Sequence, residues 1–199
     1  MPSSERLHRR ARRPRAWTVD RRPEGGLFTT QQAAAAGYSA PLLTHHLHAG
    51  RMVRVRRGVW RLVHFPAGEH EDLTAVWLWS GQEGVFSHQT ALALHDLSDV
   101  LPARLHLTLP EAWRRRRLRV PEGVVLHFHH DEVGDGARCW FGPVPATAPL
   151  RTLEDCAAEH LPPELLRAAA LDALSRGLVS RPALGAVEAA LAPFGGLAP

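Results

Sequence analysis

The pattern of apolar and polar positions changes at Leu27, where a globular sequence begins. Thr29 or Thr30 can cap a helix through the segment QQAAAA, because threonine hydroxyls accept hydrogen bonds from the first backbone amides of a helix. Gly37 is placed to end that helix in a left-handed conformation. The pattern therefore predicts a short helix near the start of the globular part.

A second helix is expected to begin at the capping residue Ser39, with Pro41 in its first turn and Gly50 just beyond its last turn. Leu43 and Leu47 are four residues apart, so they share the face that is buried. We assign His46 to packing. The side chains expected to point outward are those of Pro41, Thr44, His45 and His48.

A β-hairpin is predicted directly after this helix. The segments MVRV and VWRLV alternate apolar residues with arginine about Arg56, Arg57 and Gly58, and glycine is the residue that most readily adopts the positive φ of a tight hairpin turn. Helix, turn, helix and hairpin together predict a winged helix-turn-helix domain over residues 26–66.

Residues 67–192 are expected to form an α+β domain. Apolar helices are predicted at DLTAVWLW and at ALALHDL, the second capped by Ser87, and strands at ARLHLTLP, GVVLHFHH and ARCWFGPV. The C-terminal third reads as helices: PLRTLEDCAAEH opened by Thr147 or Thr152, then PPELLRAAALDALSRG, then SRPALGAVEAAL capped by Ser180. Residues 193–199 are expected to be a frayed tail.

The charge is divided unevenly between the two ends of the chain. Residues 1–66 contain 13 arginines against three acidic residues, whereas residues 67–199 contain 11 arginines against 17 acidic residues. We expect residues 1–25, with eight arginines, to be a basic and disordered arm. A basic half without an amphipathic apolar face favours nucleic acid over a membrane as its partner.

Composition excludes several classes of protein. All 24 basic side chains are arginine, so lysine chemistry is excluded, and the two cysteines stand far apart outside any CxxC pattern. The sequence has no run approaching the ~20 apolar residues of a membrane span. We therefore expect a soluble, cytoplasmic protein.

The candidate DNA-binding residues come from the second helix and the hairpin, where no acidic residue balances the arginines. Histidine can hydrogen-bond to base edges and arginine can neutralise phosphates. The residues assigned to DNA are Ser39, Pro41, Thr44, His45, His48, Arg51, Arg54, Arg56, Arg57 and Arg61. A second basic patch is possible at Arg114, Arg115, Arg116 and Arg117, in a loop that is otherwise simply exposed.

Other candidate chemistry is weaker. On a strand, His127 and His129 share one face while His130 points to the other, and no obvious further ligand stands beside them, so no metal and no cofactor are expected. Ser87 precedes His88, but neighbouring residues at a helix start are expected to point apart, so no catalytic residue is assigned. Arg151 and Asp155 have the spacing of an ion pair along a helix.

Four segments of the chain resemble the AbiEi family, transcriptional regulators that act as antitoxins of type IV toxin–antitoxin systems. They are SAPLLTHHLHAGRMVRVRRGVWRL (39–62), SHQTALALHDL (87–97), LHLTLP (105–110) and PATAPLRTLEDCAAE (145–159). The positions that look like those of the family's winged helix are Ser39, Leu43, Leu47, Gly50, Arg51, Gly58 and Trp60.

The resemblance implies a repressor that binds inverted repeats in its own promoter and opposes a nucleotidyltransferase toxin in phage defence, without forming a stable complex with it. Two alternatives remain open: an interaction module that restrains a toxin or defence protein directly, or a nucleic-acid-processing enzyme. The enzyme is disfavoured because nucleases fused to this kind of N-terminal domain use a lysine that this chain lacks.

Overall fold

The computed structural model describes residues 25–97, 99, 102–129 and 137–197. The chain divides into two compact units, residues 1–71 and 72–199. The basic arm expected at the N-terminus, except for Gly25, and His130 lie outside the described residues.

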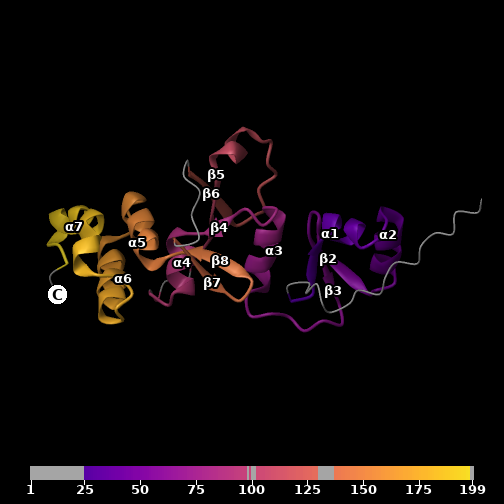
Figure 1. The fold of residues 1–199 in the computed structure, drawn as a ribbon, viewed down its shortest axis with the longest axis horizontal. Coiled ribbons are helices and arrows are strands. Elements are labelled where there is room, and N and C mark those ends of the chain that lie inside the picture. The colour runs from indigo at the N-terminus through magenta and orange to yellow at the C-terminus, as the bar shows by residue number, and fades with distance from the viewer. Residues whose placement is uncertain (1–24, 98, 100–101, 130–136, 198–199) are drawn as a thin grey trace, which may run out of the picture. The chain divides into compact units, whose positions relative to one another are not determined.

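The N-terminal unit contains the two helices and the hairpin expected from the sequence (Figure 1). They are preceded by a strand that the sequence did not predict, which pairs with the second hairpin strand so that the antiparallel sheet has the order β1-β3-β2. The elements are β1 (Leu27–Thr29), α1 (Thr30–Ala35), α2 (Ala40–His48), β2 (Met52–Arg56) and β3 (Val59–Leu62).

Local sequence explains where these helices begin. Thr29 caps α1: its hydroxyl accepts from the backbone N–H of Gln32 at 3.1 Å, and the Gln32 side chain accepts from the Thr29 N–H at 2.7 Å. Ser39 caps α2 through the backbone N–H of Leu42. The helices and sheet enclose a small core of Phe28, Ala33, Leu43, Met52 and Trp60.

The hairpin turn depends on Gly58, whose φ of 79° lies in the left-handed region. A Cβ at this glycine would meet no atom within 4 Å, so only the backbone conformation restricts the residue. Arg57 and Gly58 thus form a tight turn that exposes the arginine.

The second unit is built on a mixed five-stranded sheet of order β6-β5-β4-β8-β7. The pairs β5–β6 and β4–β8 are parallel, and the other two pairs are antiparallel. The strands are β4 (Val85–Phe86), β5 (Leu105–Pro110), β6 (Val124–His129), β7 (Arg138–Phe141) and β8 (Val144–Thr147). Three of them were expected, whereas β4 and β8 were not.

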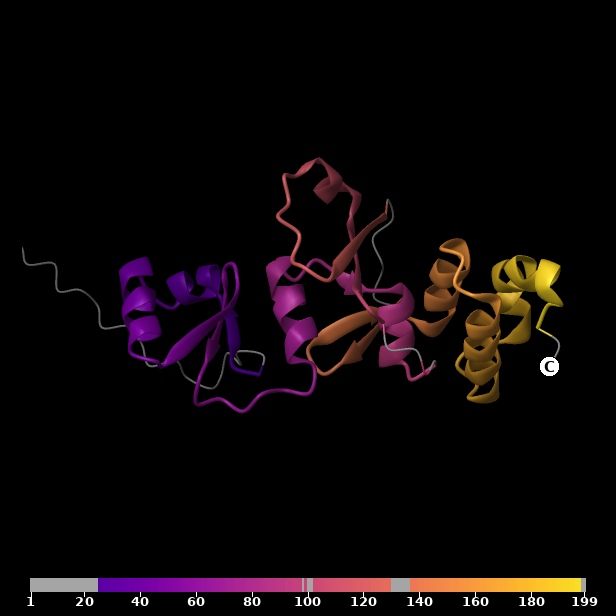
Figure 2. The ribbon, with the colours of Figure 1, turned by 180° about the vertical axis from the view of Figure 1, so that it is seen from behind.

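Helices accompany this sheet and continue to the C-terminus (Figure 2). One apolar core joins the sheet to α3 and η1, and another holds the C-terminal helices together. The helices are α3 (Glu71–Trp79), which begins at the boundary between the units, α4 (His88–Leu94), η1 (Glu111–Arg115), α5 (Pro149–Ala158), α6 (Pro163–Ser175), η3 (Arg181–Leu184), α7 (Gly185–Leu191) and η4 (Ala192–Phe194). The expected mixed α+β class is therefore confirmed.

Several expected boundaries are wrong. Thr147 ends β8 and Ala148 is the N-cap of α5, so neither Thr147 nor Thr152 opens that helix; their hydroxyls instead lie 2.7 Å apart in the interior. Ser180 does stand at the N-cap position of η3, as expected, but its side chain makes no capping hydrogen bond.

The expected frayed tail is also wrong up to residue 197, because Leu197 is buried. Arg167 donates from Nε to the Gly196 carbonyl at 2.8 Å and from Nη2 to the Phe194 carbonyl. None of the described helices is both long enough and apolar enough to cross a membrane.

Candidate functional site

The outward face of α2 carries the side chains expected from the helical pattern. Leu43 is buried in the core, whereas Pro41, Thr44, His45 and His48 are exposed, as expected. The Thr44 hydroxyl donates to the Ala40 carbonyl one turn earlier at 3.1 Å, so its hydrogen is already committed to the helix.

His46 packs against the rest of the unit, as expected. Its ring lies 5.9 Å from that of Tyr38. Burial lowers the pKa of His46, and the nearby charges of Arg51 and His45 lower it further. His46 therefore stays neutral at pH 7 and belongs to the interior side of α2.

The arginines of the hairpin differ in how accessible they are. Arg51, Arg54 and Arg57 are exposed, and among the described residues none of them forms an ion pair. Arg54 lies over the Trp60 ring with its guanidinium carbon 5.6 Å from the ring centroid, which fixes the direction of that side chain. Arg56 is half-buried, and its Nε has no hydrogen-bond partner among the described residues.

Arg61 corrects the expectation that no acidic residue balances these arginines. Its Nε lies 3.2 Å from a carboxylate oxygen of Glu71. Both side chains are about one quarter exposed. Arg61 is thus largely neutralised within the protein and is a poorer phosphate ligand than its neighbours.

The second basic patch begins in the 3-10 helix η1 rather than in a featureless loop. Arg114 to Arg117 are all exposed, but Arg114 pairs with Glu111 at 2.7 Å, and Arg116 lies over the Trp113 ring at 4.2 Å. These contacts account for Arg114 and Arg116, whereas Arg115 and Arg117 form no ion pair among the described residues.

The second unit contains a cluster that sequence reasoning missed. Ser87 and His88 were expected to point apart, with Ser87 as a helix cap, but the His88 Nδ1 lies 2.8 Å from the Ser87 Oγ and that hydroxyl caps no backbone amide. The Thr108 hydroxyl donates to the same Ser87 Oγ at 2.7 Å. The reason is the backbone of His88, whose φ of 51° turns the ring back toward the serine.

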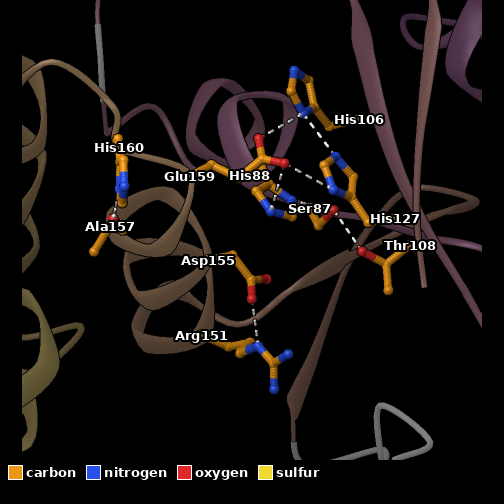
Figure 3. Close-up of polar contacts among 10 residues, drawn as sticks. All are labelled: Ser87, His88, His106, Thr108, His127, Arg151, Asp155, Ala157, Glu159 and His160. Carbon is orange, nitrogen blue, oxygen red and sulfur yellow. Dashed lines mark hydrogen bonds and ion pairs between the residues drawn. The ribbon is translucent and has the colours of Figure 1, made fainter. Parts of the chain in front are cut away.

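His88 is joined by His106 from β5, His127 from β6 and Glu159 just after α5, and their polar groups point toward one another (Figure 3). The His106 Nδ1 lies 3.0 Å from the His127 Nε2. A Glu159 carboxylate oxygen lies 3.1 Å from the His127 Nδ1. We call these four residues the histidine cluster.

Burial keeps the three imidazoles of the histidine cluster neutral. It is the main cause that lowers the pKa of His88 to about 3, with further lowering by His127 and His106. Burial also lowers the pKa values of His106 and His127. At neutral pH each ring therefore has a nitrogen lone pair available to accept a proton or a metal ion.

The histidine cluster borders a pocket of about 560 Å³, which is also lined by Arg114, His129 and Asp155. Asp155 pairs with Arg151 at 2.7 Å, as the spacing predicted. Buried Cys156 is unsuited to act as a nucleophile, because burial raises the pKa of its thiol far above neutrality.

Comparison with known proteins places these features in context. The crystal structure of the RV2827C protein from Mycobacterium tuberculosis is similar with a TM-score of 0.55 and 18% sequence identity, over 89% of this chain and 69% of that one. At this identity the similarity shows a shared fold. No curated protein sequence matches the chain. The resemblance inferred from the sequence is confirmed over residues 22–63, which match the family described as "Transcriptional regulator, AbiEi antitoxin".

Proposed function

We propose that this protein is a sequence-specific DNA-binding transcriptional repressor of the AbiEi antitoxin type. In this proposal residues 26–66 are a winged helix-turn-helix: α2 lies in the major groove and the hairpin β2–β3 is the wing. The family match over residues 22–63 covers almost the same segment.

The observation that carries the proposal is the charge of this segment. Residues 25–66 contain five arginines and no acidic residue, and Arg51, Arg54 and Arg57 remain exposed after folding. Exposed and uncompensated arginines attract a polyanion, because each phosphate contact releases a condensed counterion. Their position beside a short exposed helix favours duplex DNA.

The two parts of this surface have different roles in the proposal. On α2, His45 and His48 are exposed and can hydrogen-bond to base edges. Arg54 and Arg57 contact phosphates, which position the protein but carry no direct sequence information. Specificity therefore comes from the helix, and salt-dependent affinity comes from the wing.

Autoregulation and the antitoxin role are proposed from the resemblance to the AbiEi family over residues 22–63. The DNA target is an inverted repeat in the protein's own promoter, and the functional partner is a nucleotidyltransferase toxin with which no stable complex forms. The second unit serves regulation or toxin neutralisation, and no catalytic residue is assigned to it.

The test is binding of the purified full-length protein to the DNA upstream of its own gene and to a scrambled duplex of the same length. We expect tighter binding to the upstream DNA, with the logarithm of affinity falling against log salt with a slope of roughly −2.7 or steeper for three exposed arginines. Equal affinity for the two duplexes would contradict specific recognition. Affinity that does not change with salt would contradict the assigned surface.

A further inference from the structure

We propose that the histidine cluster is a binding site for a divalent transition-metal ion such as Zn²⁺, with His88, His106 and His127 as nitrogen ligands and Glu159 as the fourth ligand. This site lies wholly in the second unit and is independent of the DNA-binding proposal.

The first support is the convergence of donor atoms. One ring nitrogen from each of the three histidines lies within 4.8 Å of the other two. In a tetrahedral site with metal–nitrogen bonds of about 2.0–2.1 Å, the ligand atoms stand roughly 3.3 Å apart. The 3.1 Å separation between the His127 Nδ1 and a Glu159 carboxylate oxygen is close to that spacing.

The Glu159 carboxylate faces the same three imidazole rings. Its oxygens lie 3.1 Å from the His127 Nδ1 and 3.9 Å from the His88 Nε2 and the His106 Nδ1, so these three nitrogens are the ligand atoms of the proposed site. A carboxylate that approaches three imidazoles together has the placement of a fourth ligand. Three nitrogens and one oxygen form a set that suits zinc, and imidazole ligands also suit copper, nickel and iron.

The surroundings hold these ligands in place. The Ser87 hydroxyl, itself fixed by Thr108, lies against the His88 Nδ1 and leaves the Nε2 of that ring facing Glu159. Partners of this kind orient metal-ligating histidines. The positive φ of His88 is a strained conformation for a residue other than glycine, and such strain often accompanies a functional site.

The rings must adjust to coordinate one ion. His88 and His127 are stacked with centroids 3.8 Å apart and planes inclined by 20°, so both rings must tilt toward a common point. The pocket beside the histidine cluster supplies an entry path. Coordination through the His106 Nδ1 also breaks the 3.0 Å hydrogen bond between that nitrogen and the His127 Nε2.

The experiment uses the full-length protein without a histidine tag, stripped with a chelator and titrated with Zn²⁺ in competition with a chromophoric chelator. We expect one ion per chain. Co²⁺ in place of Zn²⁺ should give the visible absorption bands of a four-coordinate nitrogen and oxygen site. X-ray absorption should find light scatterers at about 2.0–2.1 Å and no sulfur.

Variants identify the ligands. His127→Gln should lower zinc affinity by more than about 100-fold, whereas His129→Gln, on the same strand and the same pocket, should leave it unchanged. The double variant His45→Gln/His48→Gln should also bind one ion, because those residues belong to the other unit. Circular dichroism of each variant verifies folding.

Glu159→Gln provides a second test at a side chain that is 44% exposed, where loss of folding is not at issue. It should weaken zinc binding by roughly 10- to 100-fold. The proposal is overturned if the stripped wild-type protein takes up no zinc, or if His127→Gln and His129→Gln lose it equally. Unchanged affinity in Glu159→Gln would remove the fourth ligand from the assignment.

Discussion

The salt dependence of DNA binding can be assigned to particular arginines. The double variant Arg51→Gln/Arg57→Gln removes two exposed guanidinium groups that form no ion pair among the described residues. The matched control is Arg61→Gln, whose guanidinium lies 3.2 Å from Glu71. All three changes remove one positive charge per site and leave most of the aliphatic stem.

The expected effect follows from counterion release. Each phosphate contact contributes about −0.9 to the slope of log affinity against log salt, so the double variant should have a slope shallower by about 1.8. Between 50 and 200 mM salt, one contact amounts to a roughly 3.5-fold loss of affinity, and two contacts to about 12-fold. The double variant should therefore be about 12-fold less sensitive to this change of salt than the wild type.

The assay is fluorescence anisotropy with labelled promoter and scrambled duplexes at several salt concentrations between those limits. Because phosphates carry no direct sequence information, the slope should change equally on both duplexes. Arg61→Gln should keep the wild-type slope. The reasoning is refuted if the double variant keeps the wild-type slope. It is also refuted if the change of slope in Arg61→Gln equals the change per substituted arginine in the double variant.

Three further predictions follow from the described contacts. Changing His45 and His48 to Ala should cost about 1–3 kcal/mol for each lost base contact on the promoter repeat and leave random DNA nearly unaffected, as competition binding will measure; equal losses on both would contradict their role as readers. Thr29→Ala removes the capping box and should lower the free energy of unfolding by about 1 kcal/mol in urea denaturation, with Thr29→Ser close to wild type. Burial lowers the pKa of His95, whose Nε2 donates to the Thr147 carbonyl. Below pH 6.5 the unfolded chain therefore takes up a proton that the folded chain does not, so the free energy of unfolding decreases as the pH is lowered. His95→Gln should lose less stability than wild type between pH 7 and pH 5, and an equal loss would exclude His95 as a source of the pH dependence.

The local parts of the fold could be predicted because short-range chemistry determines them. Ser39 and Gly50 mark the limits of α2, and Gly58 marks the hairpin turn, each within a few residues of its effect. The strands β4 and β8 were missed for the opposite reason. Two residues for β4 and the sequence VPAT for β8 are too short to show an alternating pattern. The pairing of β4 with β8 joins positions far apart in the chain, although β8 also forms a hairpin with β7.

The histidine cluster could not be assembled from the sequence. His106 and His127 meet because β5 and β6 are parallel neighbours, a pairing that no turn signal announces. The positive φ of His88 directs its ring toward His106 and His127, whereas the side chains of adjacent residues usually point apart. The one available signal was the presence of a histidine in each of the segments SHQTAL, LHLTLP and VVLHFHH, which all belong to the predicted α+β domain.

The compensation of Arg61 was missed because acidic residues were considered only within the basic stretch. Glu71 stands ten positions beyond Arg61, at the start of α3, and the fold returns it to β3. A charge count along a segment therefore overestimates how many of its arginines remain available.

Strand β1 has a consequence for how the hairpin meets a ligand. β1 pairs with β3, the backbone N–H of Thr30 donates to the Gly58 carbonyl at 2.9 Å, and the indole N–H of Trp60 donates to the Thr30 hydroxyl at 2.9 Å. The turn of the hairpin is thus bonded to the start of α1, and little conformational entropy is left for the hairpin to lose on binding. On the proposed function, a duplex therefore meets a pre-formed hairpin, so any deformation needed for a fit falls on the DNA and makes affinity depend on the stiffness of its base steps.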